Sequence, residues 1–150
     1  MSTSPAADTL VSALQVGAEL AAISDATAWL GALGAREGWP DALRFGLELS
    51  VEEALTNVIS YGFAAVDHAP QIRLEVYRQP HGRVAVRLID NGIAFDPTGL
   101  PEPDPAASIE EARIGGHGVQ LMRHFLESLS YRRAGGENQL TLVAGPKAAD

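Results

Sequence analysis

The sequence predicts an α+β fold, a two-layer sandwich in which helices cover one face of a mixed, mostly antiparallel sheet. Two observations support this prediction. Apolar residues recur every three or four positions in two long stretches, and then alternate strictly in two short runs joined by a proline and glycine turn. Helices and strands that come in separate blocks are typical of the α+β class. The 150 residues, 46% of them hydrophobic, fit a single domain over residues 1–150 with a buried core.

Three segments have the periodicity of amphipathic helices. The first runs from Gly17 to about Ala35 and the third from about Gly118 to Leu129. The second runs from Pro40-Asp41 to about Tyr61 and has a long apolar stripe made of Leu43, Leu47, Val51, Ala54, Leu55, Val58 and Ile59. We expect these helices to pack together on one face of the sheet, because each has a single apolar side to bury.

Alternating or β-prone segments supply the predicted strands, which are Thr9–Val16, Ile72–Val76, Val84–Leu88, Ser130–Arg133 and Gln139–Ala144. The second and third of these form a hairpin around the turn at residues 79–82. Residues 96–116 hold four prolines and three glycines, and a loop of that length inside a compact domain is often functional. We therefore predict that residues 96–116 form a lid, and that residues 1–8 and 145–150 are flexible tails.

The composition excludes several classes of site. Because the chain has no cysteine, it cannot build a disulfide framework, a Cys-ligated zinc site, an iron–sulfur cluster or a thiol nucleophile. A net charge of −8 argues against a nucleic-acid groove and against docking on an anionic membrane. Lys147 is the only lysine, so neither a Walker A loop nor the strand lysine of an ordinary protein kinase can be built. A bound nucleotide would need backbone N–H groups, a helix N-terminus and a metal for its phosphates.

The N-terminal residues, MSTSPAADTL, lack the basic and apolar regions of a signal peptide. The sequence also has no apolar stretch near the roughly 18 residues that a membrane span needs. We therefore expect a cytoplasmic protein with no membrane or nucleic-acid partner.

A stripe of small and polar residues runs along the second helix beside its apolar side, and consists of Gly46, Ser50, Glu53, Asn57 and Ser60. Such a stripe predicts a face that something approaches closely. Glu53 and Asn57 are four residues apart and therefore neighbours on the helix. The carboxylate can act as a general base, and the amide oxygen can bind a hard cation. The alternative is a capping box at residues 50–53 with Asn57 as a solvated surface residue.

The stretch Asp90-Asn91-Gly92 ends the second strand of the hairpin. A carboxylate buried there needs a hydrogen-bond donor, and the amino group of adenine is a suitable one. Gly92 would let a flat ring lie against the backbone. The alternative is an Asn-Gly turn with an exposed Asp90, although the proline-rich loop, not another alternating strand, follows it.

The glycine cluster at residues 115–118 leads directly into the third helix. Backbone N–H groups at a helix N-terminus form an anion site that needs no lysine. The alternative is a flexible hinge followed by a helix cap, because a short Gly-x-Gly is weak evidence by itself.

In this order, the three stretches resemble the N, G1 and G2 boxes of the Bergerat-fold ATPases, the superfamily of DNA gyrase, histidine kinases and mismatch-repair ATPases. The segments LELSVEEALTNVISYGF, LIDNGIAFDP and GGHGVQLMRHFLESLSYRR are most similar to the anti-sigma regulatory factors, which are bacterial serine/threonine protein kinases. The resemblance covers about residues 9–144. It implies the Bergerat form of the two-layer sandwich, with ATP and Mg²⁺ as the ligands.

Position by position, the resemblance implies that Glu53 is the catalytic base and Asn57 the magnesium ligand. Asp90 would bind the adenine amino group, and Gly92 would lie beneath the base. The phosphate loop would consist of Gly115, Gly116, His117, Gly118 and Val119, with His117 contributing mainly its backbone N–H. Thr141 lies near where the family often places a hydroxyl by the nucleotide.

Two residues depart from the family pattern. Tyr61 stands where a histidine is usual, and Asn138 stands where many members have a threonine. The resemblance implies a serine/threonine kinase that sequesters a sigma factor or analogous regulator and phosphorylates an antagonist protein, with a homodimer left open. The alternative function is a non-catalytic module that switches partners with ATP and ADP. A histidine-kinase catalytic domain is disfavoured, because no dimerisation helix with a phospho-accepting histidine precedes the domain.

Overall fold

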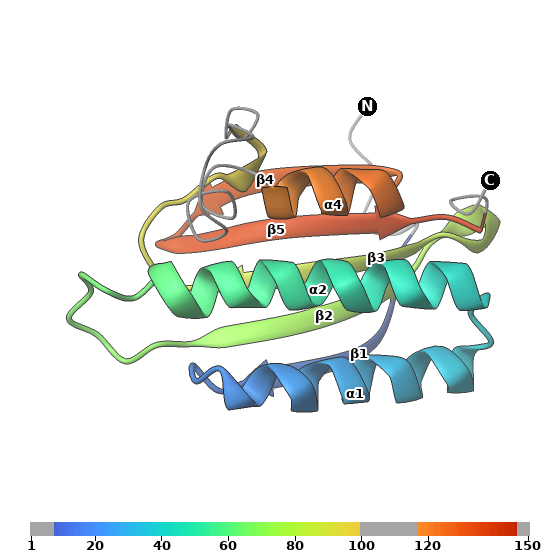
Figure 1. The fold of residues 1–150 in the computed structure, drawn as a ribbon, viewed down its shortest axis with the longest axis horizontal. Coiled ribbons are helices and arrows are strands. Elements are labelled where there is room, and N and C mark those ends of the chain that lie inside the picture. Colours follow the sequence, from blue (N-terminus) through green and yellow to red (C-terminus); the bar gives the residue numbers. More distant parts are fainter. Residues whose placement is uncertain (1–7, 100–116, 147–150) are drawn as a thin grey trace.

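The computed structural model describes residues 8–99 and 117–146. In this part of the chain, five strands form one sheet with the order β1-β2-β3-β5-β4 (Figure 1). The strands are β1 (Thr9–Val16), β2 (Ile72–Arg78), β3 (Val84–Asp90), β4 (Ser128–Ala134) and β5 (Glu137–Ala144). Each pair of neighbouring strands is antiparallel, so the sheet is more uniform than the mixed sheet that we predicted.

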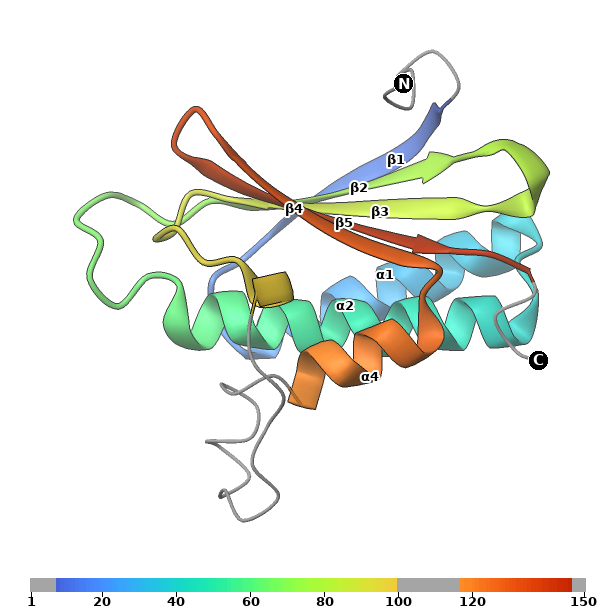
Figure 2. The same cartoon turned by 90° about the horizontal axis from the view of Figure 1, so that it is seen from above.

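The helices α1 (Ala21–Glu37), α2 (Asp41–Tyr61) and α4 (His117–Phe125) all lie on one face of this sheet. Figure 2 shows the resulting two layers, with α2 between α1 and α4. The predicted α+β two-layer sandwich is therefore confirmed. No helix in the described ranges is both long enough and apolar enough to cross a membrane.

The element boundaries follow from local signals and from the sheet. The helix α1 ends at Gly38, whose left-handed φ of 73° lets the next N–H, that of Trp39, bond to the Gly34 carbonyl at 2.9 Å. Pro40 stands immediately before α2. We predicted that the third helix continues to Leu129, but α4 ends at Phe125. Leu129 instead belongs to β4 and pairs with Leu142 of β5. The prediction was wrong because a single apolar residue fits the buried side of a strand as well as that of a helix.

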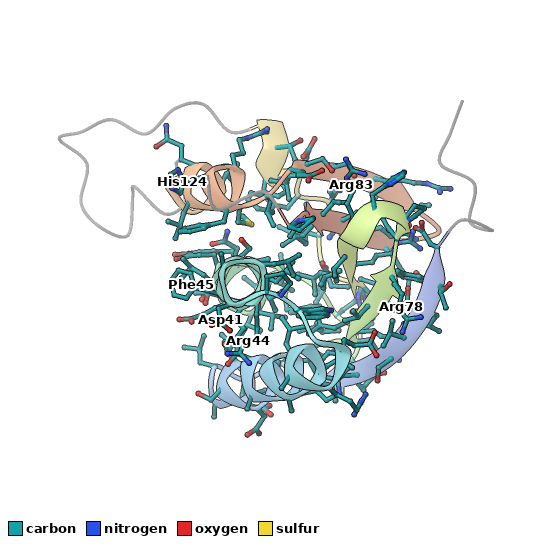
Figure 3. All side chains as sticks on the ribbon, turned by 90° about the vertical axis from the view of Figure 1, so that its right-hand side faces the viewer. Asp41, Arg44, Phe45, Arg78, Arg83 and His124 are labelled. Atoms are coloured by element: carbon teal, nitrogen blue, oxygen red, sulfur yellow. The ribbon has the colours of Figure 1, made fainter. Side chains whose placement is uncertain are left out.

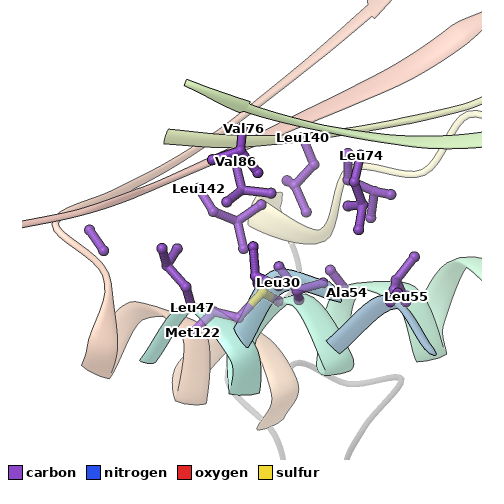
Figure 4. Packing of buried hydrophobic residues seen from close by; sticks show 14 of the residues in the cluster. Leu30, Leu47, Ala54, Leu55, Leu74, Val76, Val86, Met122, Leu140 and Leu142 are labelled. Carbon is purple, nitrogen blue, oxygen red and sulfur yellow. The ribbon is translucent and has the colours of Figure 1, made fainter. Parts of the chain in front are cut away.

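The core lies between the two layers and is almost wholly apolar. From the helices, Leu30, Leu47 and Leu55 point toward the strands, and Leu74, Val86 and Leu142 point back from the sheet (Figure 4). All of these side chains are fully buried, with exposed fractions of at most 1%. Alternate residues of β2 and β5 are buried, as expected for strands with one covered face.

The helix α4 packs closely along α2. A Cβ atom added at Gly46 would lie only 3.0 Å from the Cβ of Phe125. The rings of Phe45 and Phe125 make an edge contact at 5.6 Å, and Phe45 and His124 project on the outer side of the helical layer (Figure 3). Part of the small-residue stripe on α2 is therefore a packing surface for α4. The stripe predicted that something approaches the helix closely, and at Gly46 that group is Phe125 of α4.

Candidate nucleotide-binding site

A pocket opens between the C-terminal half of α2, the ends of β3 and β5, and α4. Its cavity volume is about 50 Å³, below the roughly 300–1,000 Å³ that is usual for small-molecule sites. Its lining is mostly apolar and comprises Ala54, Asn57, Val58, Tyr61, Gly62, Leu88, Asp90, Ile93, Phe95, Pro97, Met122, Tyr131, Asn138 and Leu140. Apolar walls with a few polar groups suit a flat ring that carries a polar edge.

Asp90 is the acidic group of this pocket and has an exposed fraction of only 4%. Its Oδ1 accepts hydrogen bonds from the Gly92 N–H at 2.9 Å and from the Asn138 Nδ2 at 3.0 Å. Within the described residues its Oδ2 makes no hydrogen bond. Burial raises the pKa of the Asp90 carboxyl, and Glu137 adds to that shift, while the bonds from Asn138 and Gly92 and the charge of Arg133 oppose it. The alternative of an exposed Asp90 is therefore wrong.

Gly92 brings the end of β3 against the end of α2. A Cβ atom at this position would lie 2.6 Å from the carbonyl oxygen of Gly62, a distance that side chains do not tolerate. The same carbonyl accepts the Ile93 N–H at 2.9 Å. Backbone contact thus requires a glycine here. This packing role exists whether or not a ring lies against Gly92.

Asn138 is the site residue whose role sequence reasoning missed. It stands directly opposite Asp90 in the β3–β5 register and is 6% exposed. Besides Asp90, its amide contacts Ile93, Tyr131, Arg133 and Phe95. The sequence gave one indication that this position is unusual, because Asn138 stands where many family members have a threonine. The sequence did not show the strand register that places Asn138 beside Asp90.

Thr141 lies away from the pocket, contrary to its predicted position near the nucleotide. It is three residues from Asn138 on β5 and pairs with Arg87. Because successive strand residues point to opposite faces, Thr141 lies on the side of the sheet away from the helices, while Asn138 and Leu140 line the pocket. The structure thus separates Thr141 from the other predicted nucleotide contacts. Tyr61, in contrast, lines the pocket and is 37% exposed.

Glu53 and Asn57 lie where α2 faces the start of α4. An added Cβ atom at Gly118 would lie 3.1 Å from the Glu53 Oε2 and 3.9 Å from the Asn57 Nδ2. Asn57 lines the pocket and is 7% exposed, so the alternative of a solvated surface residue is wrong for it. Its amide has no hydrogen bond to any described residue. An amide at the wall of the pocket without a described partner has the capacity to bind a ligand.

The predicted phosphate loop is only partly within the described residues. Gly115 and Gly116, with most of the predicted lid, lie outside them. His117 is the first residue of α4, and both Gly118 and Val119 are buried in its first turn. Glu53 and Asn57 thus lie beside the N-terminus of α4, where backbone N–H groups favour an anion.

The described residues contain no cluster of three or more His, Cys, Asp or Glu side chains that could hold a metal by themselves. This donor set still fits Mg²⁺, because that ion keeps several waters and is usually bound by one or two protein groups together with substrate phosphates. The amide of Asn57, which has no hydrogen bond to a described residue, would provide one such oxygen.

A family model for the "Histidine kinase-like ATPase domain" matches residues 16–144. The chain belongs to this family. The match includes the elements that form the pocket, from α2 to β5, and it confirms the predicted membership in the Bergerat-fold superfamily.

Two individual proteins are similar to this member of the family. The serine/threonine-protein kinase BtrW of Bordetella bronchiseptica is 40% identical over 131 residues, which cover 87% of this chain and 91% of that protein. A solved histidine kinase domain from the Erythrobacter litoralis EL346 blue-light activated histidine kinase is 20% identical, with a TM-score of 0.49. That match covers 85% of this chain and 64% of the other, so this chain spans less than two thirds of it.

Proposed function

We propose that this ATPase-family chain is a serine/threonine protein kinase of the anti-sigma type. It would bind a sigma factor or an analogous regulator and transfer the γ-phosphoryl group of ATP to an antagonist protein. The observation that carries the proposal is the arrangement of one pocket. Asp90 lies at one end of it, where it can bind adenine. At the other end Asn57, which lines the pocket, lies with the neighbouring Glu53 beside the N-terminus of α4. The 40% identity to the kinase BtrW supports the same activity.

At the base end, Asp90 would accept a hydrogen bond from the 6-amino group of adenine. Its Oδ1 is already occupied by two donors, so Oδ2 is the acceptor left for a ligand. The apolar side chains of Ile93 and Met122 line the same pocket and would cover the faces of the ring.

At the phosphate end, the first turn of α4 would receive the phosphates through backbone N–H groups. The amide oxygen of Asn57 would hold Mg²⁺, whose chemistry is to neutralise charge on the phosphates. Glu53 would orient the hydroxyl of the incoming serine or threonine and accept its proton as the oxygen bonds to the γ-phosphorus and ADP leaves. Gly118 supports this assignment, because its missing side chain leaves space beside the Glu53 carboxylate.

The decisive experiment incubates the protein with radiolabelled ATP and a candidate antagonist protein. The wild type should label the antagonist on serine or threonine. Glu53→Gln should keep the affinity for ATP but lower transfer by about 10²–10⁴-fold, because glutamine keeps the shape and not the basicity. The matched control is Glu52→Gln, which changes an exposed neighbour on the same helix and should transfer at the wild-type rate.

Two outcomes would contradict the proposal. If the wild type transfers no phosphate, yet its affinity for a partner differs between ADP and ATP, the chain is a partner-switching module. If Glu53→Gln phosphorylates the antagonist at the normal rate, Glu53 has a structural role only.

A further inference from the structure

The hydrogen bonds of Asn138 determine the orientation of its amide. Its oxygen receives three donors, which are the hydroxyl of Tyr131, the Nη1 of Arg133 at 3.1 Å and the N–H of Phe95 at 3.4 Å. Its nitrogen faces two acceptors, the Asp90 Oδ1 at 3.0 Å and the Ile93 carbonyl at 2.7 Å. If the amide were flipped, its NH₂ group would face the three donors and its oxygen would face the two acceptors, so these hydrogen bonds would be lost. The nitrogen of Asn138 is therefore held toward Asp90.

Arg133 reinforces this orientation from β4. Its Nη1 contacts both the Asn138 oxygen and, at 2.8 Å, the carbonyl of Gly92. A chain of donors thus runs from Arg133 through Asn138 to the buried carboxylate of Asp90. A hydrogen bond donated to a carboxylate stabilises its charged form more than its protonated form.

We infer that Asn138 is a positioning residue that keeps Asp90 ionised and turns its free oxygen toward the ligand. The inference rests on the proposed function, because it concerns how the pocket distinguishes a purine with a 6-amino group from one with a 6-oxo group. An ionised Asp90 can only accept a hydrogen bond, which suits the amino group of ATP. A protonated Asp90 could instead donate to the 6-oxo group of ITP.

Two charged groups act on Asp90, one from the adjacent strand β5 and one from β4, the next strand beyond it. Arg133 of β4 lowers the pKa of the Asp90 carboxyl and Glu137 of β5 raises it. The hydrogen bond from Asn138 also lowers this pKa, so removing it should raise the pKa further. Binding of ATP requires the ionised form. The loss of affinity on acidification should therefore begin at a higher pH in a variant without the Asn138 amide.

The test measures the dissociation constants of ATP and ITP by calorimetry across a pH series. The wild type should prefer ATP by roughly 10- to 150-fold at neutral pH, the range expected for a hydrogen bond to a charged group. Asn138→Ala should lower this preference, because Asp90 is no longer held in place, and should shift the acid limb of ATP binding to higher pH. Asn138→Thr keeps a hydrogen-bond donor on a β-branched side chain. It should therefore restore part of the ATP preference and part of the wild-type pH dependence. Gln139→Ala, the adjacent residue on the other face of β5, is the matched control and should change neither.

Arg133→Ala provides a second variant that does not depend on a buried substitution, since Arg133 is exposed. It should move the ATP preference and the pH profile in the same direction as Asn138→Ala, by a smaller factor. If Asn138→Ala and Arg133→Ala both keep the wild-type preference and pH profile, the inference is wrong while the kinase proposal stands. If the wild type binds neither nucleotide, the proposed function fails and this inference fails with it.

Discussion

The two ends of the pocket are built in different ways. The base end consists of strand ends and the turn after β3, and Asp90, Gly92 and Asn138 are joined there by hydrogen bonds between buried groups. The phosphate end consists of two facing helices, where small residues leave space and the buried amide of Asn57 has no described partner. At the base end the chain itself supplies donors to one oxygen of Asp90, whereas at the phosphate end Asn57 has no hydrogen bond to any described residue.

This difference has a physical cause. A buried carboxylate without hydrogen-bond donors is costly, so the protein must supply donors to Asp90 even when no ligand is bound. Polar groups beside a helix N-terminus can instead be satisfied by water, ions or phosphate when these arrive. We therefore expect substitutions at the base end to change folding stability as well as binding. Substitutions at the phosphate end should change ligand binding and catalysis alone.

Gly92→Ala should have the largest effect on the base end. Its Cβ atom would lie 2.6 Å from the carbonyl of Gly62, so either β3 or the end of α2 must move. Overpacking of this kind costs about 1–3 kcal/mol of unfolding free energy, and ATP affinity should fall with it. Urea unfolding measures the first quantity and calorimetry the second. Gly99→Ala is the control, because a Cβ atom there would have only a 3.9 Å contact. Unchanged stability of Gly92→Ala would show that the two backbones are not in obligatory contact.

Asn57→Ala tests the phosphate end. We expect ATP affinity to fall by roughly 10- to 150-fold in magnesium, and to change little when the metal is chelated, because the amide would act through the ion. The thermal midpoint of the ligand-free protein should remain close to that of the wild type. Ser60→Ala, one turn further along α2 and exposed, is the matched control. An equal loss of affinity with and without magnesium would exclude the assigned role.

Sequence reasoning predicted the local parts of this architecture well. The hairpin of β2 and β3 follows from strict alternation, and α2 follows from its apolar stripe, since both signals lie within one element. The end of α4 was wrong, because Leu129 fits the apolar side of a helix and of a strand equally well. The position of Asp90 at a strand end left open whether its carboxylate is buried or exposed, and the structure shows that it is buried.

The non-local parts could not be predicted in the same way. Asn138 and Asp90 are 48 residues apart and meet only through the β3–β5 register. Thr141 is three residues from Asn138 on the same strand and therefore lies on the other face of the sheet. The small residues of α2 gave an ambiguous signal, because Gly46 accommodates Phe125 while the same stripe continues to Glu53 and Asn57. Sequence spacing alone does not separate helix packing from a ligand site.

The base end keeps a buried carboxylate for binding at some cost in stability. Asp90→Asn tests this most directly. The pKa of Asp90 in the folded protein is raised above its ordinary value of 3.8. The stability that its proton contributes is therefore complete below the unfolded value and is lost as pH rises through the folded pKa. At neutral pH the ionised group destabilises the ligand-free fold, whereas an asparagine could still accept the bonds from Gly92 and Asn138.

Thermal unfolding of Asp90→Asn and of the wild type, from pH 3 to pH 8, gives the decisive comparison, with calorimetry of ATP on the same samples. At neutral pH we predict that the variant unfolds at a higher temperature than the wild type, because it buries no charge there. The difference should disappear at the acid end, and the variant should bind ATP more weakly. The exposed Asp67→Asn is the control and should change neither quantity. An Asp90→Asn variant that is less stable than the wild type at neutral pH, or that binds ATP equally well, would contradict the account.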